Sequence, residues 1–466
     1  MLFLERLISG YADRVSEFAI PMIIGIFAFV FPLIFQVISR IDDKYDSTLF
    51  IKVFHKECVW KCFKCIFGGA LVSCVVWMFH IPRCVDWGEC INILIDNSAL
   101  ILLVMSTIIL VITTIVVIKI MYEYYVPKLL FNRLKNNYKK CNEEDKPMLF
   151  MAISKIMQYA IKKSDKDLFL YTLKFFSEEF SNYLKEQEHQ PCEYPDEYYR
   201  VIAETNAIIH VSSHKEASFF DGSELLNLLL NGMISGKSFL VIWRELKRAL
   251  IYNNENFIMS YWQQAHQYIG IRLKDKRFEE YEKMNEFNDA LGGLLLMKKK
   301  YNLIKQLIFW TNQEPPKYVL VPETMKEVIQ RFMYMESDIN NSNPVYYEQK
   351  YPFTDVFEVF ANDVIKMWIK RYIAILFLRQ YILPEFYKFR RLEIPNISQT
   401  TQEKQKWIEE LDVLKKYVLE YLSNEELLNV LGLHKLAEPD WLTKSGKPHP
   451  KELIEKLKGE LNNWEI

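Results

Sequence analysis

A short segment bounded by glycines, from Gly232 to Ser238, carries residue types that a phosphate-binding loop needs. Its sequence, GMISGKS, is close to the pattern G-x-x-x-x-G-K-[ST], in which backbone amides surround phosphates and the lysine contacts the terminal phosphates. Only three residues separate the glycines, one fewer than the pattern requires, and the preceding SELLNLLLN reads as a helix rather than a strand. The candidate nucleotide contacts are Gly232, Gly236, Lys237 and Ser238. The preferred interpretation is a turn between two helices, with Gly232 ending the first.

A second candidate is a pair of histidines, His210 and His214, which lie four residues apart. On a helix this spacing places both rings on one face, as in histidine pairs that bind metals. The intervening residues do not form the H-E-x-x-H sequence of zinc proteases, and no nearby carboxylate is placed by spacing to complete a site. We therefore expect ordinary histidines here, with no metal ion and no cofactor.

Two further patterns are consistent with chemistry but match common sequences. Cys58, Cys62 and Cys65 have C-x3-C-x2-C spacing with His55 nearby, yet they enter an apolar segment, where cysteine behaves as a small hydrophobic residue. Asp221 followed by the triplet from Glu245 to Lys247 loosely fits the D…E-x-K spacing of metal-dependent nucleases, which would need a β-sheet that the sequence does not predict. No serine-hydrolase G-x-S-x-G occurs. We predict no catalytic residue and a non-enzymatic protein.

Composition and charge restrict the class of protein. The chain has 58 lysines and arginines against 59 aspartates and glutamates, a formal net charge of −1, so we expect no broad nucleic-acid binding. Only 14 glycines occur in 466 residues, and strand-like alternation of apolar and polar residues is almost absent. The sequence therefore predicts an all-α protein.

The strongest signal is a set of three apolar segments near the N-terminus, at about 18–38, 65–81 and 97–121. About 20 apolar residues suffice for a helix to cross the bilayer, and the first and third segments contain such runs without a charge. Pro21 and Pro32 should kink the first segment or break it locally. We predict two or three transmembrane helices, because the second segment is short.

Flanking cations give the orientation. Lysines and arginines are frequent in 40–64 and again after residue 119, whereas the loop 83–96 contains one arginine and three acidic residues. By the positive-inside rule, the first two regions are cytoplasmic and the loop is outside. Three spans then place the N-terminus outside, and two spans would place it in the cytoplasm. We expect a multi-pass protein of the cell membrane with most of its chain in the cytoplasm.

Small and hydroxyl side chains within the apolar segments predict helix packing. Gly69 and Ser73 form a small-x3-small pattern, which allows close approach of two helices. The third segment carries hydroxyls at Ser106, Thr107, Thr113 and Thr114. These predict a contact within the chain or between copies of it. A pore lining is the alternative, although it would usually include rings of charges or carbonyls.

After about residue 122 apolar residues recur every three or four positions, which indicates amphipathic helices, among them 196–213, 256–273 and 276–309. We divide the chain into a membrane anchor at 1–125, a first helical part at 126–312 and a second at 313–466. The segment 364–383 is apolar, but its four cationic residues favour a buried helix over a fourth span. Successive helical hairpins suggest a solenoid-like arrangement, although no fixed repeat is present.

These features predict an integral membrane protein whose cytoplasmic helical domain binds a protein partner or senses a signal. Its expected partners are the lipid bilayer and either a protein partner or further copies of the chain. The alternative is a membrane-disrupting or pore-forming effector, activated through its cytoplasmic domain, as in bacterial phage defence. That alternative depends on an analogy of architecture alone.

Overall fold

A computed structural model describes most of the chain as helices. The described residues are 17–79, 98–187, 193–212, 220, 222–230, 236–274, 278–309, 321–322, 325–337, 362–382, 401–424, 455 and 457–459. Every regular element within these residues is helical and none is a strand, which confirms the predicted all-α class. Internal contacts divide the chain into two compact units. Unit 1 comprises Met1–Glu178 with Asp196–Val201, and unit 2 comprises Glu179–Pro195 with Ile202–Ile466. The domain boundaries after 125 and 312 stay predictions.

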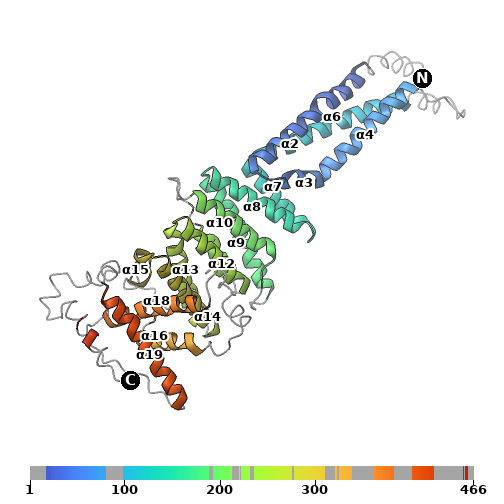
Figure 1. Cartoon of the computed structure of the whole chain (residues 1–466). Coiled ribbons are helices and arrows are strands. Elements are labelled where there is room, and N and C mark those ends of the chain that lie inside the picture. Colours follow the sequence, from blue (N-terminus) through green and yellow to red (C-terminus); the bar gives the residue numbers. More distant parts are fainter. Residues whose placement is uncertain are drawn as a thin grey trace, which may run out of the picture. The chain divides into compact units, whose positions relative to one another are not determined.

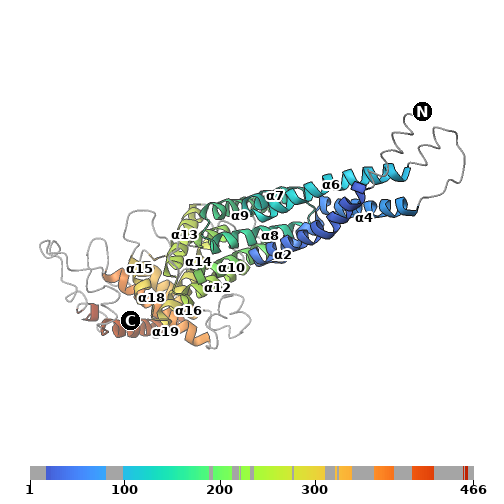
Figure 2. The same ribbon diagram turned by 90° about the horizontal axis from the view of Figure 1, so that it is seen from above.

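Unit 1 contains the apolar helices and the first polar ones (Figures 1 and 2). Its elements are η1 (Ile26–Val30), α2 (Phe31–Tyr45), α3 (Leu49–Lys56), α4 (Cys58–Phe79), α6 (Ser98–Tyr125), α7 (Pro127–Lys140) and α8 (Lys146–Lys162). Two further helices, α9 (Lys166–Glu186) and α10 (Asp196–Ser212), each contribute residues to both units.

Three helices are long and apolar enough to cross a bilayer, at Glu17–Tyr45, Cys58–Phe79 and Ser98–Tyr125. The second begins seven residues before the predicted segment, because nothing interrupts helix geometry between Cys58 and Cys65. Its extra turns carry Lys61 and Lys64, both exposed, whose ammonium groups can extend toward water from an apolar stem. With 22 residues, this helix is as able to span a membrane as the other two.

The first apolar helix changes its winding before Pro32. A π-helical turn, η1, occupies Ile26–Val30, and Pro32 lies in the first turn of α2. Proline has no amide hydrogen and its ring collides with the carbonyl four residues earlier, so a wider turn relieves both problems. Pro32 therefore marks a local disturbance of the helix, as predicted, without ending it, whereas Pro21 lies in regular helix.

The three helices pack on one another along narrow faces. Within the apolar stretches only 22%, 17% and 28% of the residues are buried, in chain order. Helix α4 packs on α6, and α6 also contacts α2. The remaining apolar side chains face outward, and in water such a surface would far exceed the patches that monomeric soluble proteins expose. Lipid is the solvent that suits this surface.

Unit 2 is formed by amphipathic helices that pack both on neighbouring helices and on helices distant along the chain (Figure 1). They are α11 (Ser223–Leu230), α12 (Gly236–Ile251), α13 (Glu255–Lys274), α14 (Phe278–Met297), α15 (Tyr301–Phe309), α16 (Met325–Ser337), α18 (Asn362–Ile382) and α19 (Thr401–Leu422). Periodicity had suggested one helix over 276–309. The structure has two, because Lys299 adopts a left-handed conformation with φ of 55°.

Helices α14 and α18 approach each other closely because two adjacent glycines lie at their contact. A Cβ atom on Gly292 would lie 2.3 Å from the ring of Tyr372, and one on Gly293 would lie 3.0 Å from the backbone nitrogen of Ile369. Both distances are below ordinary van der Waals contact. The absence of side chains at these two positions therefore permits the packing of α18.

Helix α18 is the apolar segment that resembled a fourth span. It is not among the described helices that meet the length and hydropathy of a span. Lys370 Nζ lies 2.6 Å from Glu410 Oε2, and the Arg371 guanidinium donates to both carboxylate oxygens of Glu420. Its apolar residues pack against α14, α16 and α19. The charges thus mark a helix buried among other protein helices.

Candidate functional site

The contact between α4 and α6 contains a hydrogen-bonded pair of serines. The Oγ atoms of Ser73 and Ser106 lie 2.7 Å apart, and each hydroxyl also lies within hydrogen-bond distance of a carbonyl in its own helix. Ala70, one turn before Ser73, is fully buried at the same face. Gly69 lies on the outward face instead, where an added Cβ would meet nothing within 4 Å. The close approach of these helices therefore involves Ala70 and the two serines.

The threonines of α6 bond to their own helix. Thr107 Oγ1 donates to the Leu103 carbonyl at 2.6 Å, and Thr114 Oγ1 donates to Leu110 at 2.7 Å. Both side chains are buried, and Thr113 likewise donates to carbonyls of the preceding turn. In an apolar environment these bonds remove the cost of an unpaired hydroxyl.

A partly buried ionic cluster lies where the apolar helices end. Helix α3 stops and α4 begins around Glu57, whose backbone is extended with ψ of 134°. Helix α6 stops and α7 begins at Val126, which is also extended with ψ of 113°, and Pro127 opens α7. Proline suits the first helical position and disfavours helix geometry in the residue before it. The chain thus has two helix breaks, and the side chains around them meet.

Arg133 joins the two breaks. Its Nε donates to Glu57 Oε1 at 2.7 Å, its Nη2 pairs with Glu57 Oε2, and its Nη1 donates to Glu123 Oε2 at 2.6 Å. The Tyr124 hydroxyl donates to Glu57 Oε1 at 2.8 Å. Only 8% of the Glu57 side chain and 21% of the Arg133 side chain are exposed. We call this set, Glu57, Glu123, Tyr124 and Arg133, the joint.

The joint is electrostatically strong for a site near a protein surface. The hydrogen bonds that Arg133 donates to Glu57 raise the pKa of Arg133 above its usual value, although burial acts against them. Two-point pairing between a guanidinium and a carboxylate fixes orientation as well as distance. The arrangement can therefore hold the start of α4 and the end of α6 in one geometry.

Further polar contacts surround the joint at the same ends of the apolar helices. Lys44 Nζ donates to the Tyr125 carbonyl at 2.7 Å and lies 4.4 Å from the centre of the Tyr125 ring. Lys162 Nζ lies 3.3 Å from Asp46 Oδ2, and Lys56 pairs with Asp145. These contacts are more exposed than the joint, and exposed pairs contribute little stability.

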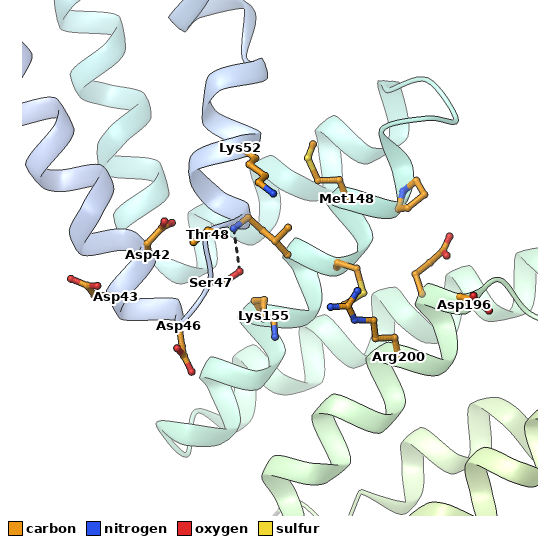
Figure 3. A pocket seen from close by; sticks show the side chains of 14 residues that line it. Asp42, Asp43, Asp46, Ser47, Thr48, Lys52, Met148, Lys155, Asp196 and Arg200 are labelled. Atoms are coloured by element: carbon orange, nitrogen blue, oxygen red, sulfur yellow. Dashed lines mark hydrogen bonds between the residues drawn. The ribbon is translucent and has the colours of Figure 1, made fainter.

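Unit 1 also contains a groove of about 1010 Å³ beside the end of α2 (Figure 3). Its walls come from the α2–α3 turn, from α3, from α8 and from the first residues of α10. Five carboxylates and three cationic side chains line it, with apolar surface between them. The lining includes Asp42, Asp43, Leu49, Lys52, Pro147, Met148, Met151, Glu197 and Arg200. The volume is at the upper end of the range for ligand sites.

His210 lies in the interior of unit 2, beside an acidic residue. It is fully buried near the end of α10, with its Nε2 3.6 Å from Glu245 Oε2 and its Nδ1 3.3 Å from the Asn254 amide nitrogen. The Asn254 donor directs the His210 proton to Nε2, toward the carboxylate. Glu245 is itself only 1% exposed and accepts a hydrogen bond from Arg248. Such a pair could act on a proton, but its burial keeps substrate away. His214 lies outside the described residues.

The other candidate residues do not come together. Gly236 is the first residue of α12, Lys237 and Ser238 follow within that helix, and Ser238 is buried. Gly232 and Asp221 lie outside the described residues. Cys58, Cys62 and Cys65 are exposed along α4. Among the described residues no group of three or more histidine, cysteine or acidic side chains is placed to bind a metal ion.

The chain matches no protein-family model, no curated protein sequence and no solved structure. The joint and the groove were both missed from sequence. The sequence predicted no role for Glu57, and it indicated Arg133 only as one of the flanking cations after residue 119. The one local signal was Pro127, which marks the break between α6 and α7 directly after an apolar run.

Proposed function

We propose that this chain is a membrane-anchored interaction protein. Its three apolar helices lie in the bilayer, and its polar helices bind a protein partner or sense a signal on the cytoplasmic side, without catalysing a reaction. The observation that carries this proposal is the joint, which connects the ends of two apolar helices to the first polar helix through Glu57 and Arg133. A purely passive anchor needs no such buried ionic connection.

The hydroxyl bonds within the apolar helices support anchoring over conduction. Ser73 bonds to Ser106, and the α6 threonines bond to their own helix. A water-filled pore would instead direct polar groups into its lumen. Before Lys119 the exposed large hydrophobic side chains of α6 are isoleucines with one leucine, one valine and one methionine, which suit lipid.

Flanking charges support the cytoplasmic placement of the polar helices. Lysines lie exposed in 52–64, before and at the start of α4, and again along α7. Tyr122 and Tyr125 are exposed at the end of α6, and tyrosine is typical of the membrane–water interface. This boundary lies on the same side as the joint.

Alkaline carbonate extraction and reporter fusions test the anchor and its orientation. We expect the full chain to stay in the membrane pellet. Green fluorescent protein inserted after Glu144 should fluoresce, and alkaline phosphatase inserted after Gly88 should be active, when the protein is made in bacteria. Release of the intact chain by carbonate, or the reverse pattern of reporter activity, would contradict the proposal.

Dye-filled vesicles distinguish this function from the effector alternative. We expect protein reconstituted into vesicles to retain the dye, also after forced dimerisation through a drug-inducible domain at the C-terminus. Rapid dye loss on dimerisation that disappears when the apolar helices are deleted would favour the membrane-disrupting effector and overturn the anchoring role.

A further inference from the structure

We propose that the groove in unit 1 binds a basic peptide segment of a partner protein that also carries apolar side chains. This inference rests on the proposed function, because it names the chemistry of the partner. The groove lies at the end of α2, so a segment bound there would sit beside the membrane surface (Figure 3).

Charge is the first argument. Five carboxylates against three cationic side chains give the lining a negative excess. Among the residues that the structure describes, Asp42, Asp43 and Glu197 form no ion pair, and the buried Oδ1 of Asp42 has no hydrogen-bond donor. Ammonium and guanidinium groups of a ligand would pair with these carboxylates. An acidic peptide or a phosphate would instead meet the carboxylates, and like charges brought together weaken binding.

The apolar surface is the second argument. Leu49, Pro147, Met148 and Met151 line the groove between the charged walls. Methionine is flexible and polarizable, and surfaces rich in methionine accommodate side chains of different shapes. A small inorganic cation would use none of this surface. A peptide with alternating basic and apolar side chains would use both kinds of wall.

The cationic side chains limit the ligand further. Lys52 points toward the groove from α3, and it forms no ion pair within the described residues (Figure 3). Arg200 lies on the opposite wall, from α10. Backbone carbonyls of an extended or helical peptide are acceptors for both. A polyamine has no acceptors, so the mixed lining favours a peptide over a simple polycation.

The proposal is tested with two synthetic peptides and full-length protein in phosphatidylcholine nanodiscs. One short peptide alternates lysine, leucine and glycine, and the other has glutamate in place of each lysine. Fluorescence anisotropy measures binding, and empty nanodiscs give the lipid background. We expect the lysine peptide to bind saturably and more weakly as salt rises, and the glutamate peptide not to bind.

Matched variants locate the binding. Asp42→Asn, Asp43→Asn and Glu197→Gln together should weaken the lysine peptide about tenfold or more, since each exposed charge contact contributes a factor of about two to five. The control combination Glu143→Gln, Glu144→Gln and Asp167→Asn removes the same number of charges outside the lining and should change affinity less than about twofold.

A second variant covers the case in which the triple variant fails to fold. Met148→Arg adds a cation at a half-exposed position of the lining and should also weaken the lysine peptide. Absent binding by the wild type, equal binding by all variants, or preference for the glutamate peptide would overturn this inference. The carbonate extraction and the reporter fusions would then still decide the membrane anchor independently.

Discussion

Removing Arg133 should destabilise the ends of the apolar helices far more than removing a neighbouring cation. The variant Arg133→Met keeps an unbranched apolar stem but leaves Glu57 and Glu123 without their cation. Breaking a buried ion pair costs about 3–5 kcal/mol when the remaining charge stays buried. Arg133 is 21% exposed and Glu123 25% exposed, so water screens part of this interaction. We expect a loss of about 2–3 kcal/mol in local stability.

Hydrogen–deuterium exchange on the full chain in lipid nanodiscs measures this loss locally, at the amides of the first turns of α4 and α7. The matched control is Lys135→Met on α7, whose ammonium lies 3.3 Å from Glu178 in a more exposed pair and should contribute less than about 1 kcal/mol. The double variant Glu57→Gln, Arg133→Met removes the stranded charge and keeps an acceptor for Tyr124. It should recover about 1–2 kcal/mol of the single variant's loss.

The reasoning would be refuted by equal exchange in the Arg133→Met and Lys135→Met proteins. It would also be refuted if the double variant were as unstable as the sum of its two single variants, because the two side chains would then not interact. Either result would leave the joint as an ordinary surface contact and remove the main support for a connection between membrane helices and polar helices.

Three further predictions concern single contacts. Gly292→Ala should lower the free energy of unfolding by about 1–3 kcal/mol, because its Cβ would overlap the buried ring of Tyr372. The control Gly270→Ala has open space around its Cβ and should stabilise its helix by up to about 1 kcal/mol. Calorimetry of the two variants measures both changes. Burial raises the pKa of Asp289 to about 6 and lowers that of His266 to about 3. The stability that protonated Asp289 contributes is therefore lost as pH rises from about 4 to 6, whereas the stability that neutral His266 contributes is lost as pH falls below about 6.5. On acidification from pH 6 to 4 the two effects oppose each other, and the variant Asp289→Asn removes the one that stabilises. Its free energy of unfolding should then fall by up to about 1.4 kcal/mol per pH unit more than that of the wild type, as measured by denaturant titrations at each pH. Ser106→Ala should cost about 0.5–1.5 kcal/mol, measured by exchange in α4 and α6, and no cost would mean that the serine pair does not contribute to their contact.

Helix positions in this chain could be predicted well from sequence because each helix has a local cause. In lipid, the uncharged run of the third apolar segment can pair its backbone N–H and C=O groups only by forming a helix. The structure shows this segment as one continuous helix, α6. The amphipathic repeats after residue 122 likewise gave helices such as α10 and α13 within a residue or two of their observed ends. The break at Lys299 was missed, because one left-handed residue among good helix formers leaves no mark in periodicity.

The candidate site could not be predicted in the same way, because its parts are distant in sequence. Glu57 and Arg133 are 76 residues apart, and they meet only because two helix breaks are brought together by the packing of α4 on α6. His210 shows the same limit. Its spacing suggested His214 as a partner, whereas packing places Glu245 beside its ring. The spacing of residues along one helix predicts which of them share a face, but it does not predict which residues of another helix pack against that face.

The contacts at the ends of the apolar helices differ in what they can transmit. Lys44, Lys56 and Lys162 form exposed pairs, which open and close readily and cannot hold one geometry. The joint is less exposed, has two-point geometry and involves both helix breaks, so the end of α6 and the start of α7 keep a fixed bend while it is intact. A displacement of α7 must then move α6, or it must first break the joint. Breaking the joint would leave a carboxylate without its cation, so for small displacements it costs less free energy to move α6 together with α7. In this way the joint couples the polar helices to the apolar ones.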